Sequence, residues 1–122
     1  MKDLLFVFIG GGLGSILRFL IGKELNTTLP YGTLLVNIIG AFVIGVLLAF
    51  YEKEIISNSS RLLLAVGFCG GFTTWSSFAF EKFHMLREGA IPHFILYIGI
   101  SILFSLIALW LAYRIVNFFD AS

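Results

Sequence analysis

The sequence has little charge and almost no cysteine. Only 12% of its 122 residues are Asp, Glu, Lys or Arg, whereas 59% are hydrophobic and the mean hydropathy is +1.02. Soluble domains carry about twice that share of charged residues. The single cysteine, Cys69, excludes a disulfide within the chain and any cysteine metal cluster. The composition therefore indicates an integral membrane protein.

Four apolar segments follow one another, and each is close to the roughly 20 residues that a helix needs to cross the hydrocarbon core. We predict an all-α membrane protein with one domain, residues 1–122, and transmembrane helices at about 4–21, 31–50, 62–83 and 94–116. The breaks between them, at 26–30, 52–60 and 87–92, are short and rich in turn-forming residues. Little sequence is left for a soluble domain, so any chemistry must lie within or between the helices.

Basic residues, which orient membrane proteins, are evenly divided between the two sides. With four crossings, both ends of the chain share a side with the 52–60 loop. That side carries Lys2, Lys53, Arg61 and Arg114, and the opposite side carries Arg18, Lys23, Lys82 and Arg87. Either other features fix a single orientation, or the chain inserts both ways round and oppositely oriented copies pair. The even balance favours the second alternative, and a dimer would also enclose a polar pathway better than four helices alone.

The third apolar segment is interrupted by glycines, hydroxyl residues and aromatics between Gly67 and Phe78. The pairs Gly70-Gly71 and Thr73-Thr74 weaken a helix at a depth where lipid cannot hydrogen-bond the freed backbone groups. Irregular backbone at that depth persists only where it is buried in protein or lines a polar cavity. The sequence therefore predicts a break in the third helix, and it favours a transport site beside that break.

Small or polar residues recur every three or four positions on the other three helices, so each row lies on one helix face. The rows are Gly10, Gly14, Arg18 and Gly22; Thr33, Asn37, Ala41, Gly45 and Ala49; and Tyr97, Ser101, Ser105, Ala108 and Ala112. A single serine in such a row commonly does no more than join two membrane helices. An amide at the depth of Asn37 needs partners, however, and three rows beside a broken helix favour a shared polar path.

Carboxylates are absent from the first, second and fourth predicted spans, and Glu81 lies near the end of the third. The polar groups are instead hydroxyls, an amide, a phenol and one arginine, all of which can donate hydrogen bonds. A cation pathway usually contains an intramembrane Asp or Glu. Aromatic ring edges carry partial positive charge, and Trp75 and Phe78 lie three residues apart beside the break. The sequence therefore favours an anion as the transported solute.

Three longer stretches are distinctive: residues 10–19 (GGGLGSILRF), 32–40 (GTLLVNIIG) and 67–74 (GFCGGFTT). They resemble signatures of the Fluc (CrcB) family of microbial fluoride channels. The row of Tyr97 and two serines in the last helix resembles the polar track of the family's fourth helix. The resemblance covers all four helices in register, and the chain length and the number of helices also fit the family.

The resemblance implies an antiparallel, dual-topology homodimer that exports toxic fluoride passively through two narrow pores at the subunit interface. The implied location is the cell membrane (plasma or inner membrane), and the implied partners are fluoride, the lipid bilayer and a second copy of the chain, with no nucleic acid. A structural sodium ion at the dimer centre is also implied, held by the backbone carbonyls of Gly70 and Thr73.

Individual pore residues follow from the same resemblance, position by position. Asn37 is implied to donate its amide hydrogens to fluoride, and Phe78 to offer its ring edges. The polar path is implied to be lined by Thr33, Ser77, Tyr97, Ser101 and Ser105. Arg18 is implied to attract anions near a vestibule, and Glu81 matches a family acid whose role is left open.

One position departs from the family pattern. Where the family reads Thr-Thr-Phe-Ser-Thr-Phe, this chain reads Thr-Thr-Trp-Ser-Ser-Phe over residues 73–78, so Trp75 replaces the first pore phenylalanine. The indole is larger, but its edge and its N–H can still face an anion. Trp75 is therefore predicted to line the pore. The exchange is either tolerated, or alters throughput, or marks a subunit that works beside a second, different copy.

Other classes of function remain open on the sequence alone. A small dual-topology exporter of multidrug organic cations would normally need an intramembrane carboxylate, which the first three helices lack at mid-depth. A non-transporting subunit of a larger complex is another alternative. An enzyme is disfavoured, because His84 and His93 flank one loop without a nucleophile–base pair or metal-ligand spacing beside them.

Overall fold

The computed structural model describes residues 1–26 and 31–120. Its elements are α1 (Lys2–Leu25), α2 (Tyr31–Glu52), α3 (Asn58–Arg61), the π-helix η1 (Leu62–Cys69), α4 (Gly70–Phe72), α5 (Ser76–Arg87) and α6 (Ile91–Asp120). Four spans are long and apolar enough to cross a membrane: Lys2–Leu25, Tyr31–Glu52, Asn58–Arg87 and Ile91–Phe119. The predicted all-α fold with four spans is confirmed. Of the predicted break at 26–30, only Asn26 lies among the described residues.

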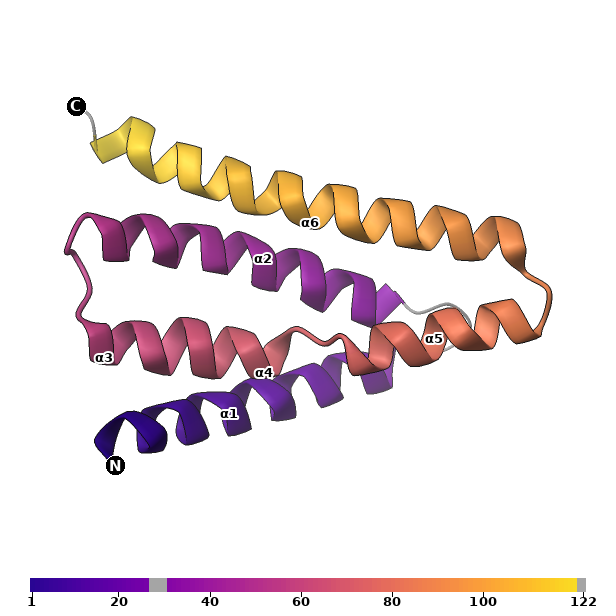
Figure 1. The fold of residues 1–122 in the computed structure, drawn as a ribbon, viewed down its shortest axis with the longest axis horizontal. Coiled ribbons are helices and arrows are strands. Elements are labelled where there is room, and N and C mark those ends of the chain that lie inside the picture. Colours follow the sequence, from indigo (N-terminus) through magenta and orange to yellow (C-terminus); the bar gives the residue numbers. More distant parts are fainter. Residues whose placement is uncertain (27–30, 121–122) are drawn as a thin grey trace.

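The four spans run side by side along the long axis of the molecule (Figure 1). The beginning of α1 and the end of α6 lie at the same end of the bundle as the loop between α2 and α3. In this arrangement α6 packs chiefly on α2, and α1 packs chiefly on η1 and α4. The third span therefore lies between α1 and α2, and its irregular part is flanked by both.

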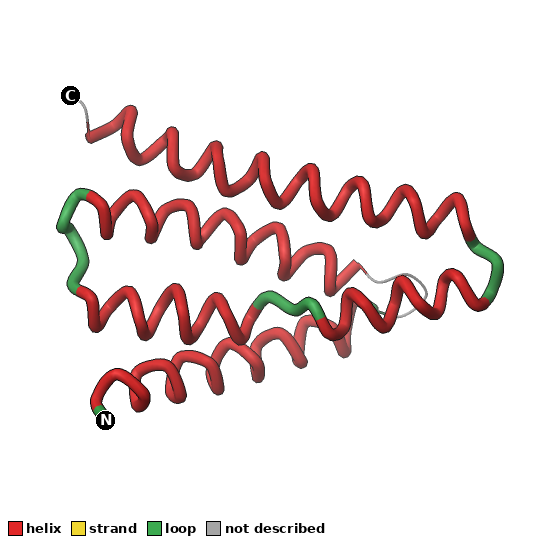
Figure 2. Tube along the Cα trace, viewed as in Figure 1, coloured by secondary structure: helices red, strands yellow, loops and turns green. Residues whose placement is uncertain are grey.

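The third span is broken between α4 and α5, in agreement with the predicted break. Figure 2 shows a short non-helical segment at this point, midway along the span. Thr73, the first residue after α4, has extended backbone angles, φ −77° and ψ 157°. The eight residues before α4, which make up η1, form a π-helix, a rare conformation that is frequently found at functional sites. The sequence analysis did not predict the π-helix.

Glycines allow α1 to approach the third span closely. Gly10 and Gly14 are buried, and a Cβ on either would lie closer than 3.0 Å to a backbone carbonyl of η1. A Cβ on Gly71 would be equally close to the carbonyl of Gly11. Such contacts between backbones require small residues, as is common where membrane helices pack without a hydrophobic driving force.

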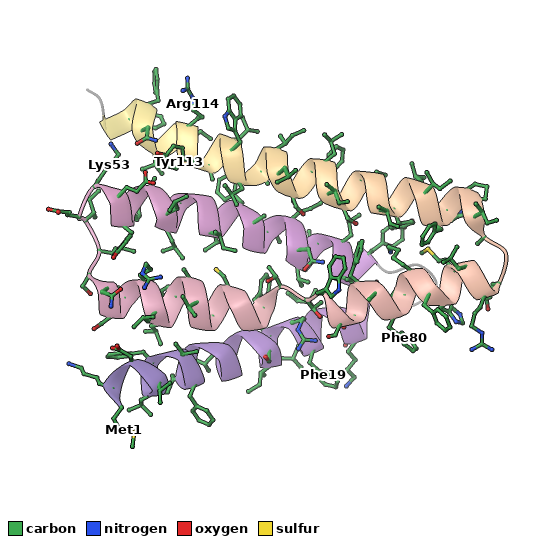
Figure 3. All side chains as sticks on the ribbon, viewed as in Figure 1. Met1, Phe19, Lys53, Phe80, Tyr113 and Arg114 are labelled. Atoms are coloured by element: carbon green, nitrogen blue, oxygen red, sulfur yellow. The ribbon has the colours of Figure 1, made fainter. Side chains whose placement is uncertain are left out.

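The outer faces of the bundle are apolar. Phe19 and Phe80, both labelled in Figure 3, are 66% and 71% exposed in the isolated chain. Side chains of this kind are expected where lipid or another membrane protein replaces water. The polar side chains described below are instead directed between the helices.

Candidate functional site

A groove of about 380 Å³ lies beside the break in the third span. Its walls come from α2, the break, the first turn of α5, and α6. Its polar residues are Asn37, Thr73, Thr74, Ser101 and Ser105, its aromatic residues are Trp75 and Phe78, and the remainder are Ala41, Ile44, Ile102, Leu106 and Leu109. The structure thus brings together predicted pore residues from three separate helices.

The side chain of Asn37 holds the broken backbone in place. Its Oδ1 accepts a hydrogen bond from the N–H of Thr74 at 2.8 Å, and its Nδ2 donates to the carbonyl of Thr74 at 3.3 Å. A side-chain amide has two N–H donors, so this arrangement uses one of them. Asn37 therefore supports the non-helical segment from the neighbouring helix and keeps a second donor.

Two carbonyls near the break lose the donors they would have in a continuous helix. In an α-helix, the carbonyl of Gly70 would accept from the N–H of Thr74, and that of Thr73 from the N–H of Ser77. The Thr74 N–H is bonded to Asn37 instead. The Ser77 N–H donates to the Thr74 hydroxyl at 3.2 Å. The break thus frees the same two carbonyls that were predicted to act as ligands.

The aromatic residues beside the break differ in exposure. Phe78 is 8% exposed and Trp75 is 76% exposed. Their ring centroids lie 5.2 Å apart, with the ring planes tilted by 30°. Both line the groove, so Phe78 forms part of its inner wall and the indole lies at its open side. The tryptophan is accommodated without displacing Phe78 from the bundle.

A second pocket, of about 230 Å³, lies between α1 and α2 and reaches the start of α5. Among the residues that line it are Arg18, Lys23, Thr33 and Ser77. Arg18 donates from Nε to the carbonyl of Gly71 at 3.1 Å. The arginine is therefore fixed against the third span, immediately before the break, and two basic side chains contribute to this pocket.

A hydrogen-bond network lies at the same end of α2. The hydroxyl of Thr33 donates to Oε2 of Glu81 at 2.6 Å and accepts from Nδ2 of Asn26 at 3.1 Å. Oδ1 of Asn26 accepts from the N–H groups of Gly32 and Thr33, and so caps the first turn of α2. Within the described part of the chain, Oε1 of Glu81 is buried without a hydrogen-bond partner. Sequence reasoning placed Asn26 in a turn and missed this role, because Asn26 does not stand directly before Tyr31, where a capping residue is normally sought.

The remaining predicted residues lie around these pockets. Ser101 is buried on α6 and lines the groove one turn from Tyr97. Tyr97 is 6% exposed, lies beside Tyr31, and borders neither pocket. Gly70 is exposed at the end of η1.

Lys82 is a residue that sequence reasoning counted only as a charge at one side of the membrane. It is 5% exposed, and its ammonium lies 4.9 Å from the ring centroids of both Phe78 and Tyr97. The sequence did contain one indication of the contact with Phe78. Lys82 is four residues after Phe78, so the two residues lie on the same face of a helix.

The fold and the groove define a multi-pass membrane protein with a polar site at a broken crossing. A family model described as CrcB-like protein, Camphor Resistance (CrcB), matches residues 5–113. The chain belongs to this family, and the resemblance predicted from its motifs is confirmed.

Similar proteins are known from several bacteria. A protein of Phocaeicola vulgatus is 42% identical over 91% of this chain and 95% of its own length. One of Yersinia pestis is 43% identical over 99% of this chain and 98% of its own length. One of Leptospira interrogans is 45% identical over 80% of this chain and 79% of its own length. Each of the three is named a fluoride-specific ion channel.

Proposed function

We propose that this protein is a fluoride-selective channel that exports fluoride passively across the cell membrane, the plasma or inner membrane, and so reduces fluoride toxicity. The names of the relatives support the choice of fluoride. The observation that carries the proposal is the groove beside the broken span, where an amide, hydroxyls and aromatic rings meet. Hydrogen-bond donors and ring edges in a narrow path are suited to an anion.

The chemistry of this groove suits a small, strongly hydrated anion. Fluoride must exchange much of its water shell for donors in the path, and larger halides are excluded largely by width. The free N–H of Asn37 and the hydroxyls of Ser101 and Ser105 are the proposed donors, and Phe78 contributes its ring edge. Thr33 and Ser77, at the adjoining pocket, and buried Tyr97 would extend the path. Arg18 would make the approach positive.

The groove lies on one side of a single chain, so we propose that a second, antiparallel copy closes it. Two copies related in this way would form two pores per homodimer. The equal number of basic residues on the two sides favours insertion in both orientations. Tags at the two ends of the chain, labelled from one side of the membrane in intact cells, are expected to react in about half of the molecules. Labelling of all molecules or of none would contradict the proposal.

We also propose a structural sodium ion at the centre of the dimer. Sodium is a hard cation that prefers oxygen ligands, and broken membrane helices commonly offer carbonyls for this purpose. The carbonyls of Gly70 and Thr73 fit, because the N–H groups of Thr74 and Ser77 are bonded elsewhere. Sodium chloride is then expected to raise the melting temperature of the purified protein above that in N-methyl-D-glucamine chloride of equal ionic strength. Identical melting curves would argue against the ion.

Fluoride efflux from proteoliposomes tests the function directly. Vesicles loaded with potassium fluoride and containing the purified protein are diluted into fluoride-free solution, and valinomycin clamps the voltage. A fluoride electrode is expected to record rapid efflux, whereas vesicles loaded with chloride should release little of it. Absence of fluoride efflux would refute the proposal. Ethidium transport driven by a proton gradient would instead favour the multidrug cation exporter.

A further inference from the structure

Lys82 is buried where a lysine in a membrane helix would normally extend toward water. Long basic side chains usually bury their stems and keep the ammonium at the interface. Helical side chains, however, tilt toward the N-terminus of their helix, and the N-terminus of α5 is at the break. Lys82 follows this tilt and lies over Phe78, one turn nearer the break, with only 5% of its surface exposed.

The ammonium of Lys82 has two aromatic faces as its neighbours. It lies over the rings of Phe78 and Tyr97, and each centroid is 4.9 Å away. This distance is within the roughly 6 Å of a favourable cation–π interaction. Phe78 and Tyr97 come from α5 and α6, so one cation joins the two elements. Both rings belong to the set predicted to line the pore.

The charge of Lys82 is not cancelled by a close ion pair. Across residues 1–26 and 31–120, its ammonium makes no hydrogen bond and no salt bridge within 4.0 Å. The neighbouring carboxylate of Glu81 attracts it electrostatically, but that carboxylate accepts its short hydrogen bond from Thr33. The ammonium of Lys82 therefore lies behind the inner wall of the groove without a direct ionic contact, and its nearest neighbours are the two rings.

This placement affects the groove through the ring of Phe78. The ring lines the groove, whereas Lys82 does not. An aromatic ring has a negative face and a positive edge. A cation on the face draws the π electrons toward itself and makes the hydrogens at the edge more positive. An ammonium at the face and an anion at the edge therefore stabilise each other.

We propose that Lys82 is a positioning residue of the pore, which fixes Phe78 and Tyr97 and strengthens the attraction of the Phe78 ring edge for fluoride. The inference rests on the proposed function, because it assigns a role in the same path. The proposed role requires the positive charge of Lys82. A role in packing alone does not, because methionine could fill the same space. The proposed role also differs from long-range attraction of anions, because the buried charge acts through the ring of Phe78.

The variants Lys82→Met and Lys82→Arg test this proposal. Efflux is measured from proteoliposomes at several internal fluoride concentrations, which gives a maximal rate and a half-saturating concentration. We expect Lys82→Met to raise the half-saturating concentration about tenfold, equivalent to about 1.4 kcal/mol and within the range of cation–π interactions. Lys82→Arg keeps the charge and should stay within about twofold of the wild type.

Lys2→Met provides a matched control. Lys2 also lies over a phenylalanine four residues away, with its ammonium 5.9 Å from the ring of Phe6, but it is exposed at the start of α1. This variant should leave both kinetic constants unchanged. A wild-type half-saturating concentration in Lys82→Met, with fluoride flux intact, would overturn the role of Lys82 and leave the proposed function standing. Absence of flux in the wild type would overturn both.

Two further measurements separate the proposed role from a structural one. If Lys82→Met does not elute from a sizing column as the wild type does, Lys82→Gln is compared with Lys82→Arg, and equal half-saturating concentrations would overturn the proposal. The effect of Lys82→Met should also persist when an impermeant salt raises the ionic strength to 1 M, where the Debye length is about 3 Å. Disappearance of the effect would assign Lys82 to remote attraction and refute action through the ring.

Discussion

Phe78→Ile is expected to reduce the rate of fluoride efflux at least about a hundredfold while the protein still folds. Isoleucine is apolar and fills much of the same volume, but it has no positively polarised ring edge. A hundredfold decrease corresponds to about 2.7 kcal/mol of lost stabilisation along the path. Phe78 is only 8% exposed and forms part of the inner wall of the groove, so an anion that follows the proposed path passes beside its ring. The initial rate of efflux from voltage-clamped proteoliposomes measures the effect.

Phe80→Ile is the control for this substitution. Phe80 is two residues further along α5, but its side chain projects from the outer face of the bundle and is 71% exposed (Figure 3). The same chemical change there should alter the rate by less than about twofold. An efflux rate in Phe78→Ile equal to that of the control would remove Phe78 from the pore. Sizing chromatography of both variants shows whether assembly is retained.

The four spans could be predicted from the sequence because apolar composition is a local property. Each segment is long enough to satisfy its own backbone hydrogen bonds in lipid. The ends of the helices were predicted less accurately than their existence. The last helix runs from Ile91 to Asp120, beyond the predicted 94–116, because polar residues such as Asn117 can continue a helix after the apolar run ends. Hydropathy reports the part of a helix that lipid covers, and the helix itself can be longer.

Part of the candidate site was also accessible to sequence reasoning, through helical periodicity. Residues spaced by four share a helix face, and Asn37, Ser101 and Ser105 do line one groove. The paired glycines and threonines indicated the break, because these residues weaken a helix. They did not indicate which side chain bonds the freed backbone groups. Spacing could not show that the amide of Asn37 bonds both backbone groups of Thr74.

The remaining features depend on contacts between distant segments. Arg18 was predicted near a vestibule, but its bond to the carbonyl of Gly71 requires the close packing of α1 on the third span. Lys82 gains its place from Tyr97 on another helix as well as from Phe78 on its own. The π-helix η1 has an apolar sequence that would suit an α-helix equally well. Periodicity along one helix contains no information about such pairs.

Asn37→Ala is expected to abolish measurable fluoride efflux and to destabilise the protein by about 2 kcal/mol. The substitution removes the acceptor for the N–H of Thr74 and the donor to its carbonyl, at a depth where water does not replace them. A buried backbone group left without a partner typically costs about 1–3 kcal/mol. The freed segment can then return toward a regular helix, which would move Phe78 and the hydroxyls of the break away from the groove. Efflux rate and thermal unfolding in the same detergent measure the two effects.

Asn58→Ala supplies a matched comparison, because Asn58 is an exposed asparagine whose side chain accepts hydrogen bonds from Arg61, three residues away. It should leave both measurements near the wild-type values. The two effects of Asn37→Ala need not coincide, and their separation is informative. Lost efflux with an unchanged unfolding temperature would assign the amide to the anion alone and contradict its role in holding the break. Normal efflux with lowered stability would assign it to the break alone and remove it from the proposed path. Loss of both is the result expected of an amide that uses one N–H for the backbone and offers the other to fluoride.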